Sequence, residues 1–190
     1  MRGGALSSKR SSPGIDRIVD GGGGIPYSDD DLVKICDGKV NVVSYKDVMR
    51  AQHVDQVLGK HGAAIMLYET RPRYGHWVAL IRQGPDLVEF FDSYGMAPDQ
   101  QLSFVPPQMN MHPCLEELFA RSGVRCVWNK TKLQAEGQKV STCGRWAALR
   151  IAWKYIPMQV FVKDFQGQSL KPDSYVTLLT LWGDGPDQRE

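Results

Sequence analysis

The hydrophobic pattern divides the chain into an N-terminal arm and one folded unit. Residues 1–24 are rich in Gly, Ser and Arg and show no sustained apolar period. Such a composition is typical of a flexible arm. Apolar residues begin to recur near Ile25, and we expect a single domain from residue 25 to residue 190. A chain of 190 residues, 42% hydrophobic and 23% charged, is long enough to bury one good core.

Polar caps followed by apolar periodicity predict the helices. Ser28 precedes three aspartates and then an apolar stretch, which is a start signal for a helix. Ser44 with Asp47 repeats this signal, and residues 45–60 are expected to form one or two helices. Later helices are predicted over residues 115–121, 158–165 and 172–182, the last with Pro172 in its first turn.

Short apolar, β-branched and aromatic runs between turn residues predict the strands. These runs cover residues 63–68, 76–82, 87–91 and 124–128. Apolar residues occupy both alternating sets of positions, so we expect helices on both faces of the sheet. The sequence therefore predicts an α+β fold with a central mixed sheet of about four to five strands flanked by helices.

The run from Cys143 to Trp153 predicts a helix in the interior of the domain, because it is apolar on almost every side. Ser141 or Thr142 can cap this helix, which leaves Cys143 in its first turn. Free backbone N–H groups and the helix dipole favour a negative charge there, so a thiol in that place ionises more easily. The alternative is that Cys143 is a small core residue.

A hairpin over the second and third predicted strands brings together two polar side chains. If its turn is centred on Gly84, His76 lies directly opposite Asp92. A carboxylate at that position orients the imidazole and stabilises its charged form, which in turn favours a nearby thiolate. A register slip of one residue would place the two side chains on opposite faces. Solvated strand ends are the alternative interpretation.

Two glutamines precede the cysteine in a polar loop. Attack of a thiolate on a carbonyl creates an oxyanion, which needs hydrogen-bond donors. The side-chain amide of Gln134 or Gln138 can supply one donor and the backbone N–H of Cys143 another. The alternative is that both glutamines face solvent.

Composition and charge exclude several other classes. A net charge of +2 gives no strong case for a nucleic-acid partner. The four cysteines are far apart with no C-x-x-C pair, which argues against a zinc knuckle and a disulfide framework. A metal site made of His76, Asp92 and Cys143 lacks the usual ligand spacing. The absence of an apolar run of roughly 18–20 residues and of a signal-peptide pattern predicts a protein that is neither membrane-bound nor exported.

Four sequence blocks in a fixed order resemble a known protein family. They are GHW (75–77), FDSYG (91–95), LQ (133–134) and TCGRW (142–146). Together they look like the cysteine proteases that comprise the adenovirus maturation protease and the ubiquitin-like-modifier (SUMO) proteases. The short chain is most similar to the viral and virophage branch. The resemblance covers roughly residues 62–156 and implies a papain-like core, with the cysteine at the N-terminus of a buried central helix.

The resemblance also implies a role for each matched residue. Cys143 is similar to the nucleophile of the family, His76 to its general base, Asp92 to its orienting acid and Gln134 to its oxyanion donor. The family usually places the glutamine about six or seven residues before the cysteine, whereas Gln134 precedes Cys143 by nine residues and Gln138 by five. Gln138 is therefore the alternative donor. Trp77 is similar to the tryptophan that lines a narrow substrate groove, although a core position is equally compatible with the sequence.

The resemblance implies that the chain would be a cysteine endopeptidase that cleaves after Gly-Gly or Gly-x in viral capsid or core precursors during virion maturation. It would work without a cofactor or metal, as a monomer, in the virion and in the host cytoplasm or nucleus, with a peptide or nucleic-acid activator as an option. A deubiquitinase or SUMO-type isopeptidase, and an inactive binding module of the same fold, are the alternatives. The sequence MRGGA at residues 1–5 looks like a cleavage site, so self-processing is an additional hypothesis.

Overall fold

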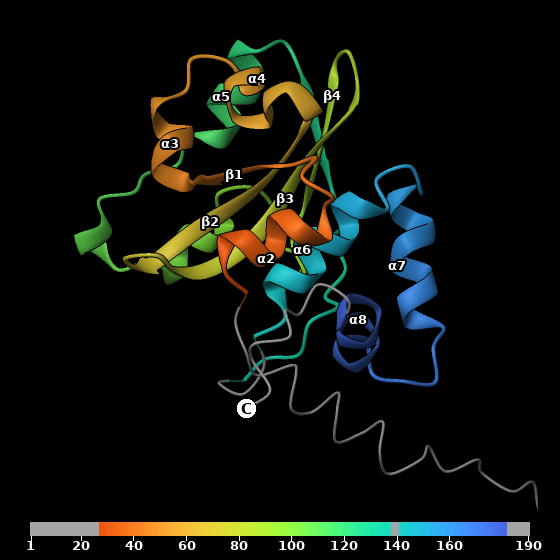
Figure 1. Cartoon of the computed structure of the whole chain (residues 1–190). Helices are drawn as coiled ribbons and strands as arrows, with labels where there is room; N and C mark the ends of the chain where they lie inside the picture. The colour runs from red at the N-terminus through yellow and green to blue at the C-terminus, as the bar shows by residue number, and fades with distance from the viewer. Residues whose placement is uncertain (1–26, 138–140, 182–190) are drawn as a thin grey trace, which may run out of the picture.

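The computed structural model describes residues 27–137 and 141–181, which are built around one five-stranded sheet (Figure 1). The strands are β1 (Asn41–Ser44), β2 (Ala63–Arg71), β3 (Tyr74–Gly84), β4 (Leu87–Phe91) and β5 (Arg125–Trp128), in that spatial order. The two outer pairs are parallel and the two inner pairs antiparallel. The predicted mixed sheet is therefore confirmed, with β1 as a strand that the sequence pattern missed. The predicted arm, residues 1–24, lies outside the described residues.

The helices begin and end close to the predicted positions. They are α2 (Asp29–Ile35), α3 (Tyr45–Arg50), α4 (Val54–Leu58), α5 (Leu115–Arg121), α6 (Cys143–Ala152), α7 (Met158–Gln166) and α8 (Pro172–Thr180), with short 3-10 turns η1 (Gly59–His61), η2 (Gln100–Phe104) and η3 (Pro107–Met109). Ser28 and Ser44 both form the predicted capping boxes, with Asp31 and Asp47 as their partners. Among the described residues, no helix combines the length and the apolar character needed to cross a bilayer.

Two hydrophobic cores cover the two faces of the sheet, as the apolar pattern predicted. Ile65 and Ala79 belong to the core that α2, α6, α7 and α8 complete. Their neighbours Met66 and Leu80 belong to the core formed with α3, α4 and α5. Figure 1 shows these two groups of helices on opposite sides of the strands. Successive side chains along each strand therefore point alternately into the two hydrophobic cores.

The register of the β3–β4 hairpin differs from the predicted one by two residues. The turn is centred on Pro85 and Asp86, and a local irregularity lies between Arg82 and Gly84. The ladder then pairs Ala79 with Phe91, so the prediction that His76 lies directly opposite Asp92 is wrong. A shift of two residues, unlike a shift of one, keeps each side chain on its original face of the sheet.

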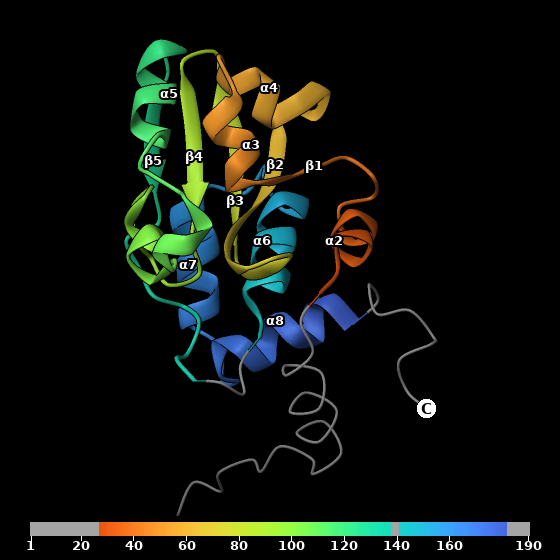
Figure 2. The same cartoon turned by 90° about the vertical axis from the view of Figure 1, so that its left-hand side faces the viewer.

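Helix α6 is fixed to the sheet at one end and to α8 at the other. Every residue from Gly144 to Ile151 is buried, so the prediction of a buried central helix is confirmed. Near the C-terminal end, Arg150 binds Glu89 of β4 through two N–H groups at 2.6 and 2.9 Å. Figure 2 shows α8 lying across the other end of α6, where Cys143 begins the helix. This arrangement places the thiol at one end of the sheet.

Candidate active site

A cavity of about 540 Å³ opens where β3 extends beyond the last paired residue of β4. Its walls come from residues that are far apart in sequence: Tyr27, Thr70, Arg73, Tyr74, Gly75, His76, Trp77, Tyr94, Met96, Gln101, Phe104, Lys132, Gln134, Glu136, Ser141 and Cys143. Four of the five predicted site residues are in this set. The fifth, Asp92, is fully buried behind His76.

The carboxylate of Asp92 is held in a single orientation. Its Oδ1 atom is 2.8 Å from Nε2 of His76 and accepts a second hydrogen bond, also 2.8 Å, from the backbone N–H of Tyr94. Its Oδ2 atom accepts a hydrogen bond of 2.7 Å from the side chain of Gln101. The side chain of Asn129 brackets the Asp92 backbone, donating to its carbonyl at 2.6 Å and accepting from its N–H at 2.9 Å. This network fixes the position of the Asp92 carboxylate, which in turn orients the imidazole of His76.

The imidazole of His76 lines the same cavity as the thiol of Cys143, and the two groups shift each other's pKa. Since Nε2 is engaged with Asp92, the ring presents Nδ1 to the sulfur. Burial by itself lowers the pKa of His76, but the hydrogen bonds to Asp92 and Cys143 outweigh it and raise the pKa from 6.5 to about 10. The ring is therefore charged at neutral pH.

The thiol of Cys143 is correspondingly more acidic than a free cysteine. Burial by itself raises its pKa, but the hydrogen bond and charge of His76 lower it by more. The backbone N–H groups of Trp77 and Gly144 lower the pKa of Cys143 further. Both shifts favour the thiolate–imidazolium pair, the reactive form of a nucleophilic cysteine.

The start of α6 is not capped in the predicted way. Thr142 occupies the N-cap position, but its side chain makes no capping hydrogen bond. The Thr142 hydroxyl instead donates a charge-assisted hydrogen bond to the carboxylate of Asp173 in α8.

Gln134 is turned into the cavity, and its solvent-facing alternative is wrong. The side chain is buried at 2% exposure, and its Oε1 atom accepts a hydrogen bond of 2.7 Å from the Ser93 hydroxyl. Its Nε2 atom donates to the hydroxyl of Tyr94 at 3.2 Å. Gln134, Tyr94 and Cys143 all line the same cavity. Gln138, the alternative donor, lies outside the described residues.

Tyr94 is a site residue that the sequence reasoning missed. Its ring stacks on that of His76, with the centroids 4.9 Å apart and the planes inclined by 22°. The chain turns back at Gly95, which has a φ of 73° and lies where a Cβ atom would come within 2.6 Å of the Thr131 backbone. The glycine in the FDSYG block was the available signal, because this close approach requires it.

Trp77 is both a core residue and a wall of the cavity. It is 7% exposed and belongs to the core on the α6 side of the sheet. A Cβ atom added to Gly144 would lie 3.3 Å from Cδ1 of the indole, so the ring closely approaches the start of α6. Trp77 thus packs in the core and also borders the cavity, and its role in substrate binding stays a prediction.

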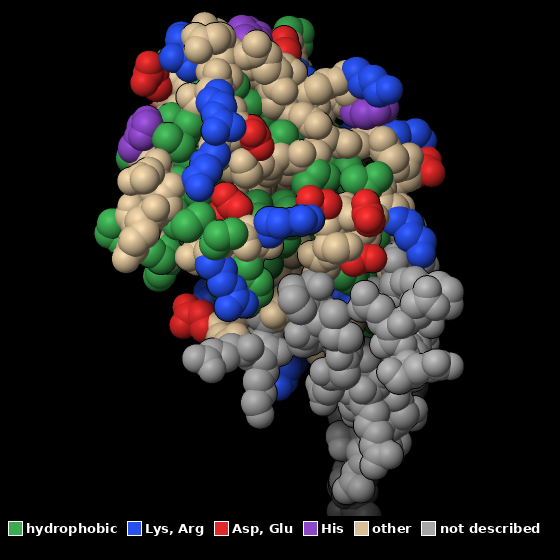
Figure 3. Space-filling model, turned by 60° about the vertical axis from the view of Figure 1, so that its left-hand side comes forward, with side chains coloured by type: hydrophobic (Ala, Val, Ile, Leu, Met, Phe, Trp, Pro, Cys, Tyr) green, Lys and Arg blue, Asp and Glu red, His purple; other side chains and the backbone are tan. Residues whose placement is uncertain are grey.

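The surrounding surface carries charges of both signs. In Figure 3 acidic and basic side chains are interspersed over the visible described face, with hydrophobic side chains between them. Within residues 27–137 and 141–181 no group of three or more His, Cys, Asp and Glu side chains could hold a metal ion. The site contains a nucleophile, a proton donor and acceptor, and hydrogen-bond donors, which together suit acyl transfer.

Comparisons with known proteins find a sequence relative and a similar solved structure. No protein-family model matches the chain. The uncharacterized protein V9 of Sputnik virophage is 30% identical over 166 residues, which is 83% of this chain and 95% of V9. The crystal structure of the ASFV pS273R protease matches with a TM-score of 0.43 and 12% identity, over 83% of this chain and 70% of that one.

Proposed function

The chain belongs to the same protein family as protein V9 of Sputnik virophage, and we propose that it is a viral cysteine endopeptidase. One observation carries the proposal. Cys143 lies in one cavity with His76, which lowers the pKa of its thiol and whose Nε2 atom is 2.8 Å from the buried carboxylate of Asp92. This arrangement supplies a nucleophile, its general base and an acid that orients the base, all at an open cavity. These are the groups that hydrolysis of an amide through a covalent intermediate requires.

The proposed reaction begins with attack of the Cys143 thiolate on the carbonyl carbon of a peptide. The C–S bond forms, and the carbonyl electron pair moves to oxygen. Gln134 Nε2 and the backbone N–H of Cys143 donate hydrogen bonds to this oxyanion. As the C–N bond breaks, the imidazolium of His76 gives its proton to the departing amine. Water then attacks the thioester while His76 takes its proton, which releases the acid and regenerates the thiolate.

We further propose that the substrate presents Gly-Gly or Gly-x before the cleaved bond, in a capsid or core precursor. The close approach of Trp77 to Gly144 supports a narrow channel beside Cys143 that favours small residues. The relationship to a virophage protein supports a viral setting. Action during virion maturation, in the virion or in the host cytoplasm or nucleus, is part of the proposal. Self-processing near MRGGA involves residues 1–5, which lie outside the described residues.

The test is hydrolysis by the full chain, with Cys143→Ala as the control. The substrates are a fluorogenic Gly-Gly aminomethylcoumarin peptide, a capsid precursor containing Gly-Gly, and ubiquitin-like modifiers joined to a fluorophore. We expect Cys143-dependent cleavage of the coumarin peptide and the precursor. Rapid turnover of the modifier conjugates alone would reassign the chain as an isopeptidase. A Cys143 thiol with no enhanced reactivity, together with no cleavage, would identify an inactive binding module.

A further inference from the structure

The hydroxyl of Tyr94 carries a hydrogen atom for which the described residues provide no acceptor. Its oxygen accepts from Gln134 Nε2 at 3.2 Å. Within residues 27–137 and 141–181 no acceptor is found for the proton that the hydroxyl itself carries. A phenol that accepts one hydrogen bond retains its own O–H as a donor. This donor borders the cavity that contains Cys143.

The separation of the two groups suits a shared acceptor. Nε2 of Gln134 and Oη of Tyr94 are 3.2 Å apart. Donors in an oxyanion hole lie about 2.7–3.1 Å from the oxygen they stabilise, so one oxygen can contact both atoms at once. The orientation of Gln134 is fixed by Ser93, and that of the Tyr94 ring by stacking on His76.

The hydroxyl keeps its proton throughout the useful pH range. Burial, and to a lesser extent the negative charge of Cys143, raise the pKa of Tyr94 from 10.0 to about 12. A neutral phenol donates to an oxyanion, whereas a phenolate would repel it. Burial, the larger cause, persists after the thiolate has reacted, so the donor stays protonated when the oxyanion forms.

We propose that the Tyr94 hydroxyl is a catalytic donor that binds the oxyanion beside Gln134. The inference rests on the proposed peptidase function. It assigns Tyr94 a contact with the reacting oxygen that is separate from the stacking of its ring on His76. No covalent bond to Tyr94 forms or breaks, and its proton stays on the hydroxyl.

Tyr94→Phe is the direct test, because it keeps the stacked ring and removes the O–H. We expect kcat for the Gly-Gly aminomethylcoumarin peptide to fall about 10²-fold, the usual cost of one oxyanion donor, with little change in KM. Affinity for a Gly-Gly aldehyde should fall by a similar factor, since its adduct with Cys143 carries the same oxygen. Alkylation of Cys143 by iodoacetamide should keep the wild-type rate, because displacement at that carbon forms no oxyanion.

The double variant Tyr94→Phe with Gln134→Ala separates a contact with substrate from an indirect effect through Gln134. A direct donor predicts that Tyr94→Phe lowers kcat further in the Gln134→Ala background. No further loss would mean that Tyr94 only positions Gln134, and would overturn the proposal. An equal loss of alkylation rate would also overturn it, because the hydroxyl would then act on the ion pair.

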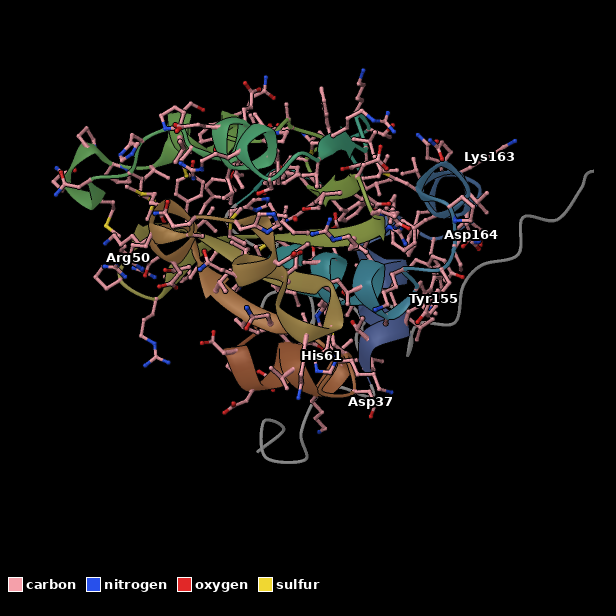
Figure 4. All side chains as sticks on the ribbon, turned by 90° about the horizontal axis from the view of Figure 1, so that it is seen from above. Asp37, Arg50, His61, Tyr155, Lys163 and Asp164 are labelled. Carbon is pink, nitrogen blue, oxygen red and sulfur yellow. The ribbon has the colours of Figure 1, made fainter. Side chains whose placement is uncertain are left out.

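Tyr155→Phe supplies a matched control. Tyr155 is 88% exposed, follows the opposite end of α6 and is labelled at the periphery of the molecule in Figure 4. This variant should hydrolyse the peptide at the wild-type rate. If Tyr94→Phe turns over at the wild-type rate, the role of Tyr94 is contradicted and the peptidase function is not. If Cys143→Ala turns over as fast as the wild type, the peptidase function itself is contradicted.

Discussion

Thr142 and Asp173, 31 residues apart in the chain, are joined by a hydrogen bond from the hydroxyl to the carboxylate. The same carboxylate accepts from the indole N–H of Trp146 at 3.0 Å and from the backbone N–H of Ala135 at 2.7 Å. Asp173 lies in the first turn of α8. One side chain therefore ties the start of α6 to the segment that carries Gln134.

Asp173→Ala should reduce turnover by misplacing Gln134 relative to Cys143. A displacement of about 1 Å in a catalytic group can cost on the order of 10²-fold in rate. We expect kcat to fall toward that level, while alkylation of Cys143 changes much less, because Asp173 does not contact His76. Asp164→Asn, at an exposed aspartate of α7 labelled in Figure 4, is the control and should have no effect. Unchanged kcat in Asp173→Ala would contradict the positioning role.

Iodoacetamide at about pH 6 should label Cys143 far faster than the other cysteines. Its pKa is lowered, whereas burial raises the pKa of Cys36 and of Cys126 to about 12 and also raises that of Cys114. Peptide mapping by mass spectrometry measures the site of labelling. His76→Ala should remove the preference for Cys143. Labelling spread equally over the four cysteines would contradict the ion pair.

The rate of hydrolysis should have a broad pH plateau. As pH falls through the lowered pKa of Cys143, the thiolate is protonated and kcat/KM declines. As pH rises through about 10, His76 loses the proton that the leaving amine requires, and the rate declines again. Folding raises the pKa of His76, so its contribution to stability is complete below about 6.5 and is lost as pH rises toward 10. Initial rates in constant-ionic-strength buffers test the two limbs.

Asp92→Asn should shift the alkaline limb of that profile downward. Without the carboxylate charge the imidazolium is less stable, so the pKa of His76 moves back toward 6.5. We expect kcat/KM to fall about 10²-fold, within the usual contribution of acid–base catalysis. Asp86→Asn in the exposed turn of the same hairpin is the matched control. An unshifted limb in Asp92→Asn would show that Asp92 does not govern the titration of His76.

Glu89→Gln should destabilise the fold by leaving the buried charge of Arg150 without its partner. The side chains of Arg150 and Glu89 are 0% and 3% exposed, and removing one member of such a pair costs about 3–5 kcal/mol. Glu117→Gln breaks a pair whose side chains are 43% and 74% exposed, and should cost less than about 1 kcal/mol. Urea unfolding measures both. Equal effects of the two changes would contradict a dominant role for burial.

Short-range signals explain where sequence reasoning succeeded in the fold. The capping boxes at Ser28 and Ser44 each use residues three apart, and both helices begin where those signals place them. The register of the hairpin was wrong because the turn lies at Pro85 and Asp86 and not at Gly84, and the irregularity between Arg82 and Gly84 makes the net shift two residues. Asp92 still reaches His76, because the error was an even number of residues.

The sequence alone determined the elements, the two-sided burial of the sheet and the residue types that carry the chemistry, since periodicity and caps depend on neighbours a few positions away. Tertiary structure decided that Gln134 faces the cavity, that Tyr94 stacks on His76 and that Asp173 holds Thr142. Those contacts join segments 18 to 40 residues apart. Their geometry depends on how the helices pack against the sheet, which no local pattern encodes.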